Sequence, residues 1–565
     1  MGSSGDRIVD PGPRTPVSGL RDAWSVDHPA VAATVARVLA AGGNAFDAGV
    51  AGALTECAVS PHLTSLAGAV TGLLFDAKRG EYVQLESSGT MPADLAPFSP
   101  LPGAPGARAV ASIPGTASGL GALHARYGSL PWKELCRDAI DWAERGHVVS
   151  SFEYGVLVEY QHVITHSPAG RALFRPNGLP VAVGERLRNP ELAVTLDALA
   201  SEGPEYMLTG SWAREFLREA NAIGWRISPA DMKSAAPDWL APVSFEHRGS
   251  RIVGLAPPQL SGVFSALVLG ILAELGVSEC SFLSAEHLFN LTHTLRYALQ
   301  QGIFLGDPRA AEFDWAPLLD RILHQYSARL LRGLRPKLDL TRHTNLRGVV
   351  GEQPPGFTNA IGEPGAPSQA FGPRSGSCEL SIVDRYGNWL QLMTTCAAGG
   401  IPGRVIGGVP MHGSAYAFSA LQPVFHARIA PGIRPRSVVA HTFVSANAVA
   451  GTPPDMGLGT PGAPFVVIPQ VLSNMLDFNL APQAAIDAPR CSMMDEQESF
   501  VAEDRIGSDV VAGLAARGVR MRAMAGYEWH TGSIQMCWRE GESLAATSDP
   551  RRTGVAGGTS ADKAT

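Results

Sequence analysis

The sequence predicts a packed α+β protein, and three features support this. Of the 565 residues, 45% are hydrophobic and 17% are charged, against a charged share of about 25% in typical soluble proteins. The chain therefore has enough apolar content for a large core, arranged as one unusually large fold or as three or four domains. Apolar helical patterns occur near the N-terminus, at 29–41 and 45–59, and short strand-like runs occur at 69–87 and 377–395.

The two N-terminal helices have recognisable boundary residues. Asp27 is expected to cap the first helix, which starts around Pro29 and stops before Gly42. Asn44 is expected to cap the second, with Asp47 completing a capping box three residues later. A hairpin follows, with its turn at 78–80. Further helical patterns lie at 116–146, with a break at 128–131, and at 190–222, 262–276, 284–302 and 315–333.

Charge and cysteine usage exclude several classes of function. The net charge is −7 and no basic run is present, so no nucleic-acid partner is expected. The seven cysteines are widely spaced and form no C-x-x-C pair, which predicts neither a disulfide framework nor a metal or cofactor site. The N-terminus lacks a signal-like apolar segment, and the longest apolar run, around 263–275, is too short to cross a membrane. We therefore expect a cytoplasmic location.

The most informative segment follows a loop-like stretch. Residues 343–376 are rich in Gly, Pro, Ser and Asn without periodicity, which predicts a long exposed loop. The next residues predict a β-hairpin, and pairing Asp384 with Asn388 at its turn places Ser377 opposite Thr395 on one sheet face. Local pattern alone favours ordinary roles for both hydroxyls, with Ser377 as a backbone cap and Thr395 as a common strand residue.

A series of motifs resembles the γ-glutamyltranspeptidase family along nearly the whole chain, in matching order and spacing. Each motif is weak by itself, but their succession makes chance similarity implausible. The motifs lie at 41–62, 113–132, 256–262, 306–308, 381–388, 434–437, 459–464, 487–490 and 548–552.

The resemblance implies an N-terminal nucleophile hydrolase with a four-layer αββα sandwich, made as a precursor that cuts its own backbone. Aligned on the hairpin turn, the cut falls between Gly376 and Ser377, where the family usually has Thr. The products would be a large chain, 1–376, ending in the processing loop 343–376, and a small chain, 377–565, paired as a heterodimer. By the same resemblance, Thr395 holds the nucleophile hydroxyl, and the N–H groups of Gly462 and Ala463 form the oxyanion hole.

A serine at this junction suits self-cleavage. Its hydroxyl attacks the preceding carbonyl, the acyl group shifts from N to O, and hydrolysis frees an α-amine, whose ordinary pKa of about 7.7–8.0 suits a general base. Gly376 offers little steric hindrance to this attack. Cys378 is a rival start site because a thiol is more nucleophilic, but it points to the opposite sheet face and is one residue out of register.

The charged residues with which the family binds its substrate are missing from this sequence. A γ-glutamyl donor carries two charges, which cost several kcal/mol each to desolvate without partners. The family's Arg position corresponds to Ser88 and its Asp position to Ala417, so both charged anchors are absent. The remaining predicted pocket positions are Ala397, Ser414, Ser437 and Val438.

The predicted catalytic residues are retained, whereas the predicted pocket residues differ from those of the family. Together they predict a self-processing hydrolase that acts on a small-molecule substrate other than a γ-glutamyl compound. Divergent relatives in alkylproline antibiotic pathways resemble C–C hydrolases, which makes acyl or carbon–carbon bond cleavage the first hypothesis. Two alternatives stay open, a γ-glutamyl hydrolase or transferase with relocated anchors and a non-catalytic, unprocessed binding protein. Four further residues could contact the substrate, although each residue type is more often solvated or structural: Glu379, Arg404, His412 and His441.

Overall fold

The computed structural model describes residues 4–96, 112–300, 307–310, 316–324, 376–396, 399–401, 403–411, 430–434, 439–446, 449, 451–494 and 498–560. The predicted loop at 343–376 lies outside these residues except for Gly376, as does the predicted helical pattern beyond 324.

The N-terminal helices form where the sequence predicts them. Helix α1 spans Pro29–Ala40 and α2 spans Ala45–Val59. The capping box of Asn44 and Asp47 is confirmed. The predicted cap of α1 is wrong, because the His28 ring, not Asp27, accepts the Ala30 N–H at 3.1 Å. The carboxylate of Asp27 instead accepts the N–H of Glu379 at 2.7 Å, so it serves another strand.

The strands assemble into one large antiparallel sheet within the described residues. It has 13 strands in the order β6-β3-β2-β10-β9-β1-β18-β17-β14-β13-β8-β7, with β19 paired to β1. Strand β1 also pairs with both β9 and β18, so it joins the two halves of the sheet. The strands are β1 (Val17–Val26), β2 (Ala69–Asp76), β3 (Glu81–Ser87), β6 (Asp238–Leu240), β7 (Val243–His247), β8 (Ser250–Gly254), β9 (Ser377–Val383), β10 (Trp389–Thr395), β13 (Ala440–Ser445), β14 (Met456–Thr460), β17 (Gln535–Glu540), β18 (Ser543–Ser548) and β19 (Val555–Ser560).

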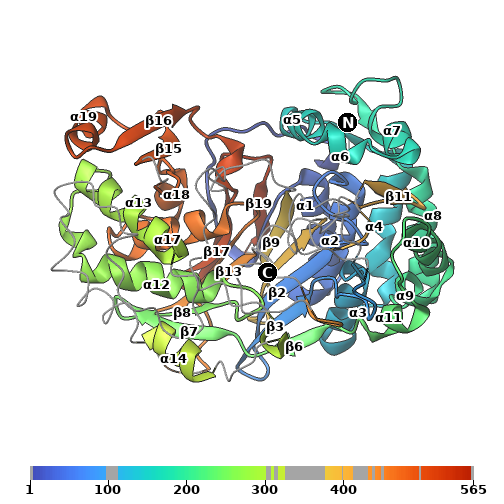
Figure 1. The fold of residues 1–565 in the computed structure, drawn as a ribbon. Helices are drawn as coiled ribbons and strands as arrows, with labels where there is room; N and C mark the ends of the chain where they lie inside the picture. Colours follow the sequence, from blue (N-terminus) through green and yellow to red (C-terminus); the bar gives the residue numbers. More distant parts are fainter. Residues whose placement is uncertain are drawn as a thin grey trace.

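The sheet halves face one another across a buried apolar cluster. Phe75 and Trp389, from β2 and β10, pack there with Phe443 from β13 and Cys537 from β17. A second cluster fills the space between α1, α2 and neighbouring helices and the outer face of the first half. A third lies between α12 (Ser261–Glu274), α17 (Pro464–Leu476) and the outer face of the second half. Figure 1 shows the strands in the middle with helices on both sides.

The other predicted helical segments are confirmed where the structure describes them. The pattern at 116–146 forms two helices separated at 128–131, and those at 190–222, 262–276 and 284–302 form helices close to the predicted bounds. The remaining helices are α3 (Thr116–Tyr127), α4 (Trp132–Arg145), α5 (Ser151–Glu159), α6 (Gln161–Ile164), α7 (Pro168–Phe174), α8 (Pro190–Glu202), α9 (Tyr206–Thr209), α10 (Ser211–Ala222), α11 (Pro229–Ser234), α13 (Ala285–Gln300), α14 (Ala316–His324), α18 (Pro482–Asp487) and α19 (Ser508–Ala516).

Short two-stranded sheets lie outside the main sheet. They are formed by β4 (His147–Val148) with β5 (Arg186–Leu187), β11 (Arg404–Ile406) with β12 (Val409–Met411), and β15 (Ser499–Glu503) with β16 (Arg520–Met524).

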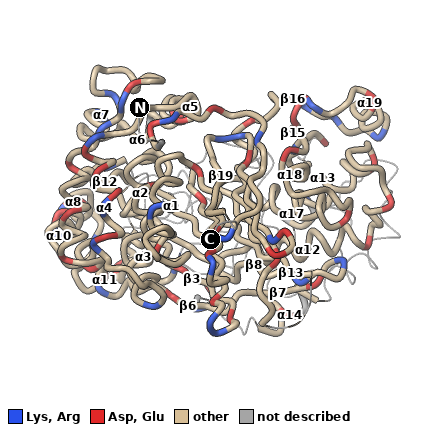
Figure 2. The backbone as a smooth tube through the Cα atoms, turned by 180° about the vertical axis from the view of Figure 1, so that it is seen from behind, with Lys and Arg blue, Asp and Glu red and all other residues tan. Residues whose placement is uncertain are grey.

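Charged residues of both signs are interspersed throughout the fold. Figure 2 shows basic and acidic residues alternating over the molecule rather than gathered in one field. Of the helices that the structure describes, none combines the length and apolar character needed to cross a membrane. The cytoplasmic location expected from the sequence stays a prediction.

Candidate functional site

The hairpin predicted from the sequence is confirmed in register. Strands β9 and β10 pair antiparallel with Ser377 opposite Thr395. At the turn, the Asp384 N–H donates to the Asn388 carbonyl at 3.1 Å, and Gly387 adopts a φ of 84°, which the absence of a side chain permits. The two predicted site hydroxyls therefore start and end one hairpin, on the same face of the sheet.

The carbonyl before Ser377 is held by the second hydroxyl. The Thr395 hydroxyl donates to the Gly376 carbonyl oxygen at 3.1 Å. A Cβ added to Gly376 would lie 2.2 Å from Leu63 Cδ2, so a side chain there would displace Leu63. This arrangement polarises the carbonyl that a Ser377 hydroxyl would attack. The structure thus places Gly376, Ser377 and Thr395 together.

The rival thiol lies in a different environment. Cys378 is fully buried in an apolar cluster with Leu63 and Phe152. Burial, with Glu56 and Asp27 nearby, raises the pKa of the Cys378 thiol well above its usual value. The thiol therefore stays protonated near neutral pH and is a weak nucleophile, which favours Ser377 as the start site.

Two buried residues of opposite charge flank the start of β9. Arg552 Nη1 donates to the Ser377 carbonyl at 3.2 Å, while Asp27 accepts the Glu379 N–H and, at 2.8 Å, Gln535 Nε2. Burial raises the pKa of Asp27 to about 6, and the Arg552 charge opposes the rise. Sequence reasoning assigned neither residue to the site, and the only signal was the 548–552 motif that contains Arg552.

The predicted oxyanion residues form a tight turn before α17. Gly462 has a φ of 85° and Ala463 a φ of 43°. Among the described residues, no acceptor takes the N–H of Gly462 or of Ala463. A Cβ on Gly462 would lie 3.2 Å from Arg552 Nη2. Since Arg552 also binds the Ser377 carbonyl, one side chain connects this turn to the predicted nucleophile.

A buried network of ion pairs lies next to the turn of Gly462 and Ala463. Arg490 pairs with Asp549, and Arg551 contacts Glu503 at 2.6 Å and Asp549 at 3.1 Å. Arg490 also donates to the Gly532 carbonyl at 2.9 Å, and a Cβ on Gly532 would lie 2.8 Å from the Gly462 oxygen. The motifs at 487–490 and 548–552 therefore brace the turn.

The left-handed conformation of Ala463 gives a first prediction. An L-residue there costs roughly 1–2 kcal/mol, whereas glycine adopts it freely at a smaller entropic cost in the unfolded chain. We expect Ala463→Gly to raise the free energy of unfolding by up to about 1 kcal/mol and to keep its N–H donor. Thermal and denaturant unfolding measure the change. Ala463→Val is the control and should destabilise the protein; a glycine variant less stable than the parent would contradict the prediction.

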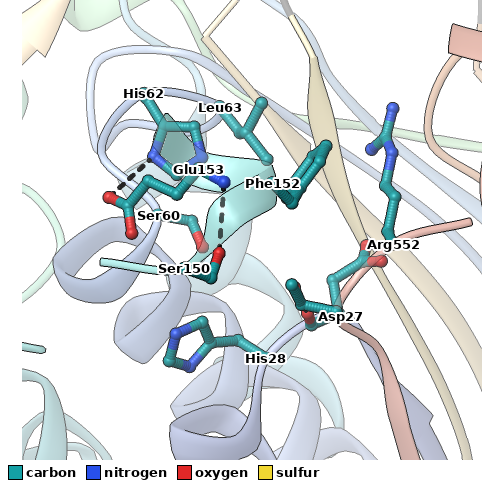
Figure 3. Close-up of a pocket in the computed structure, with 10 residues that line it drawn as sticks. Asp27, His28, Ser60, His62, Leu63, Ser150, Phe152, Glu153 and Arg552 are labelled. Carbon is teal, nitrogen blue, oxygen red and sulfur yellow. Dashed lines mark hydrogen bonds and ion pairs between the residues drawn. The ribbon is translucent and has the colours of Figure 1, made fainter. Parts of the chain in front are cut away.

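A small polar pocket lies beside the start of β9, on the side of Cys378. Figure 3 shows His62 facing Glu153, with Arg552 and Asp27 on the other side. His62 and His147 contact the Glu153 carboxylate at 3.3 and 2.9 Å. Burial opposes ionisation of Glu153, but these histidines hold its pKa well below its usual range. The pocket is lined by Asp27, His28, Ser60, His62, Leu63, Ser150, Phe152, Glu153, Arg552 and Thr553.

Ser88 is the only predicted substrate-pocket residue among those described. Its side chain is fully buried, and its N–H and hydroxyl both bind the Glu86 carboxylate. A cation does lie nearby, because Arg434 donates to the Ser88 carbonyl, to the Ala236 carbonyl and, at 2.7 Å, to Asp238. The predicted positions outside the described residues are Ala397, Ser414, Ala417, Ser437 and Val438.

The remaining candidate contacts are a buried pair, one partly exposed arginine and one residue outside the described ranges. Glu379 and His441 are fully buried and lie 3.1 Å apart. Arg404 contacts Glu219 of α10 at 3.5 Å and is partly exposed. His412 lies outside the described residues. Over the part of the chain that the structure describes, no cluster of three or more His, Cys, Asp or Glu is arranged to hold a metal ion.

Comparisons with known proteins agree on one family. The family model described as Gamma-glutamyltranspeptidase matches residues 31–559. The chain is 26% identical over 574 residues to the acylase ACY 1 proenzyme of Pseudomonas sp. (strain V22), covering 96% of each chain. It is 26% identical over 561 residues to the glutathione hydrolase proenzyme of Pseudomonas aeruginosa, covering 93% of this chain and 92% of the relative.

Two solved structures share the fold over nearly the whole chain. Cephalosporin acylase from Bacillus halodurans superposes with a TM-score of 0.77 at 23% identity, covering 97% of both chains. The structure of LmbA2991HD superposes with a TM-score of 0.74 at 24% identity, covering 97% of this chain and 100% of that one.

Proposed function

Since this chain belongs to the γ-glutamyltranspeptidase family, we propose that it is a self-processing N-terminal nucleophile hydrolase for a substrate without a γ-glutamyl group. The mature form is then a four-layer αββα heterodimer of 1–376 and 377–565. The bond cleaved in the substrate is an acyl bond or a carbon–carbon bond next to a carbonyl.

Processing begins with the Ser377 hydroxyl. Its oxygen attacks the Gly376 carbonyl carbon, the Thr395 hydroxyl stabilises the charge on the carbonyl oxygen, and the C–N bond breaks to leave an ester on Ser377. The proton that the hydroxyl gives up ends on the Ser377 nitrogen as this bond breaks. Water then hydrolyses the ester, which leaves Gly376 as a carboxylate and Ser377 with a free α-amine.

In turnover, the same residue supplies nucleophile and base. The α-amine takes the proton from the Ser377 hydroxyl as its oxygen attacks the substrate carbonyl. The N–H groups of Gly462 and Ala463 stabilise the oxyanion, and the proton passes to the leaving group. The leaving group is an amine for an amide substrate, or a carbon atom stabilised as an enol or enamine for a carbon–carbon substrate. Water hydrolyses the acyl-enzyme and restores Ser377.

One observation argues against a γ-glutamyl substrate. At the predicted anchor position, the Ser88 hydroxyl donates a hydrogen bond to the Glu86 carboxylate. The guanidinium of the nearby Arg434 donates its hydrogen bonds to acceptors of the protein itself. No described residue there presents a free cation to a substrate carboxylate. The acylase name of the Pseudomonas relative supports the same proposal. An alkylproline-type carbon–carbon substrate is its narrower form, and it rests on the resemblance to the divergent relatives of alkylproline antibiotic pathways.

A series of nitroanilides tests the proposal. The γ-glutamyl anilide has an α-ammonium and an α-carboxylate, the glutaryl anilide keeps only the carboxylate, and the butyryl anilide has neither. We expect kcat/KM for the γ-glutamyl compound to be at least 100-fold below that of the better of the other two. Ser377→Ala is the control for background hydrolysis. Preferred turnover of the γ-glutamyl compound would instead establish relocated anchors, the second candidate function.

A further inference from the structure

The side chains of Glu379 and His441 meet in the space between the two sheet halves. Glu379 follows Ser377 by two residues on β9, so both side chains project from the same face. His441 lies on β13, in the opposite half of the sheet. Neither side chain has any exposed surface, and Glu379 Oε1 lies 3.1 Å from His441 Nδ1.

This contact joins polar atoms that lack other partners. Over the described residues, neither carboxyl oxygen of Glu379 nor Nδ1 of His441 has a hydrogen-bond partner, and the 3.1 Å approach of Oε1 to Nδ1 is the polar contact that joins them. Buried polar atoms in native proteins are nearly always satisfied, and leaving one unsatisfied costs about 1–3 kcal/mol. A proton shared between Oε1 and Nδ1 would satisfy these two atoms, and Oε2 keeps no partner among the described residues.

The hydrogen bond on the other side of the ring fixes the tautomer. His441 Nε2 lies 3.0 Å from the Thr71 carbonyl oxygen, which only accepts, so Nε2 carries a hydrogen. In a neutral ring Nδ1 is then an acceptor. The shared proton belongs to Glu379 if the pair is neutral and to His441 if the pair is ionic.

The surrounding charges decide between these two states. Asp27 accepts the backbone N–H of Glu379, and Glu56 on α2 is also close enough to disfavour a negative charge on Glu379. Burial and these two carboxyl groups raise the pKa of Glu379 well above its usual value, while burial lowers the pKa of His441 to about 3. Both effects favour the neutral pair, which also avoids the desolvation cost of a buried ion pair.

The pair connects the strand of the nucleophile to the strand that leads into the oxyanion turn. His441 pairs with Gly459 across β13 and β14, and a Cβ on Gly459 would lie 2.0 Å from Glu379 Oε1. Gly459 precedes Gly462 by three residues. The Glu379 carboxyl group therefore rests against the oxyanion strand itself, and His441 reaches back to β2 through Thr71.

We propose that Glu379 and His441 form a neutral, proton-sharing pair that sets the spacing between the nucleophile strand and the oxyanion strand. Both are positioning residues, since neither touches the reacting atoms. The role rests on the proposed function, but the protonation state of the pair does not.

Conservative and non-conservative variants test the role in processing. Glu379→Gln keeps the size and supplies an amide N–H donor to Nδ1, whereas Glu379→Leu has a similar volume without a donor. We expect the rate of precursor cleavage to stay within about threefold for Gln and to fall at least 30-fold for Leu. Equal loss in both variants would overturn the proposal. Gly459→Ala, which crowds the same carboxyl group, should lower the cleavage rate about as much as Glu379→Leu does.

The protonation state is read in a protein that does not need to process. In the Ser377→Ala precursor labelled with ¹⁵N-histidine, His441 should give the signals of a neutral ring with hydrogen on Nε2, assigned by their loss in His441→Gln. Imidazolium signals that persist at pH 7 would overturn the neutral pair. If wild-type protein does not process, the proposed function fails while this measurement keeps its meaning.

Stability against pH supplies a second readout. The pKa of Glu379 is raised by folding, so the folded chain holds a proton that the unfolded chain releases above about pH 4.3. This contribution to stability is present below that pH and is lost as pH rises towards the folded-state pKa. Glutamine does not titrate, so the Tm of Glu379→Gln minus the Tm of the parent should increase as the pH rises from 5 to 8. A constant Tm difference or the opposite trend would overturn the neutral state.

Discussion

Ser377→Ala is expected to leave the chain as one uncut polypeptide of 565 residues. The substitution removes the only hydroxyl that can attack the Gly376 carbonyl from the neighbouring position, and loss of a nucleophile costs roughly 10⁶-fold in rate in a well-studied hydrolase. Denaturing electrophoresis and N-terminal sequencing measure the result. The parent protein should give two fragments, the shorter starting at Ser377, and the variant should give neither fragment nor any turnover of an acyl anilide.

Two controls separate loss of the nucleophile from loss of the fold. Ser377→Thr keeps a hydroxyl at the same place and should still cleave, while Cys378→Ala should cleave at nearly the parent rate because the Cys378 thiol is buried and protonated. The Tm of Ser377→Ala should match that of uncut parent protein. A Ser377→Ala protein that still cleaves, with a fragment starting at Cys378, would overturn the assignment.

Local patterns predicted the elements of the fold and, in the candidate site, the pairing of Ser377 with Thr395. The hairpin register follows from the turn residues and the two-residue strand period, so Ser377 and Thr395 could be paired from the amino-acid sequence alone. Likewise, the Asn44 capping box is set by residues three apart. Such features depend on residues that are close together in the sequence, which is why they can be predicted from it.

The residues that the sequence did not reveal interact over long distances along the chain. Asp27 looks like a helix cap, yet its carboxylate binds the backbone of Glu379, 352 positions away. Arg552 reaches the Ser377 carbonyl across 175 positions. No local rule relates such pairs, because the β1 pairing that brings them together depends on the assembled sheet. The predicted helix cap failed for the same reason, since a tertiary partner outcompeted the local one.

Thr395→Val is expected to slow processing by about 10²- to 10³-fold, the usual cost of removing one oxyanion donor. Valine keeps the shape and β-branching but cannot donate to the Gly376 carbonyl, which the threonine hydroxyl contacts at 3.1 Å. The buried carbonyl also loses a partner, which should lower stability by about 1–3 kcal/mol.

Thr395→Ser is the matched control for that prediction. It keeps the donor and loses only a methyl group, so its processing rate should lie within about tenfold of the parent rate, because the donor carries most of the effect. Precursor cleavage is followed at a fixed interval below each Tm, which removes the stability difference between variants. If Thr395→Val and Thr395→Ser were to process equally fast, the hydroxyl would serve only the strand. Processing lost in Val and kept in Ser would instead locate the effect in the single hydrogen bond to the bond being cut.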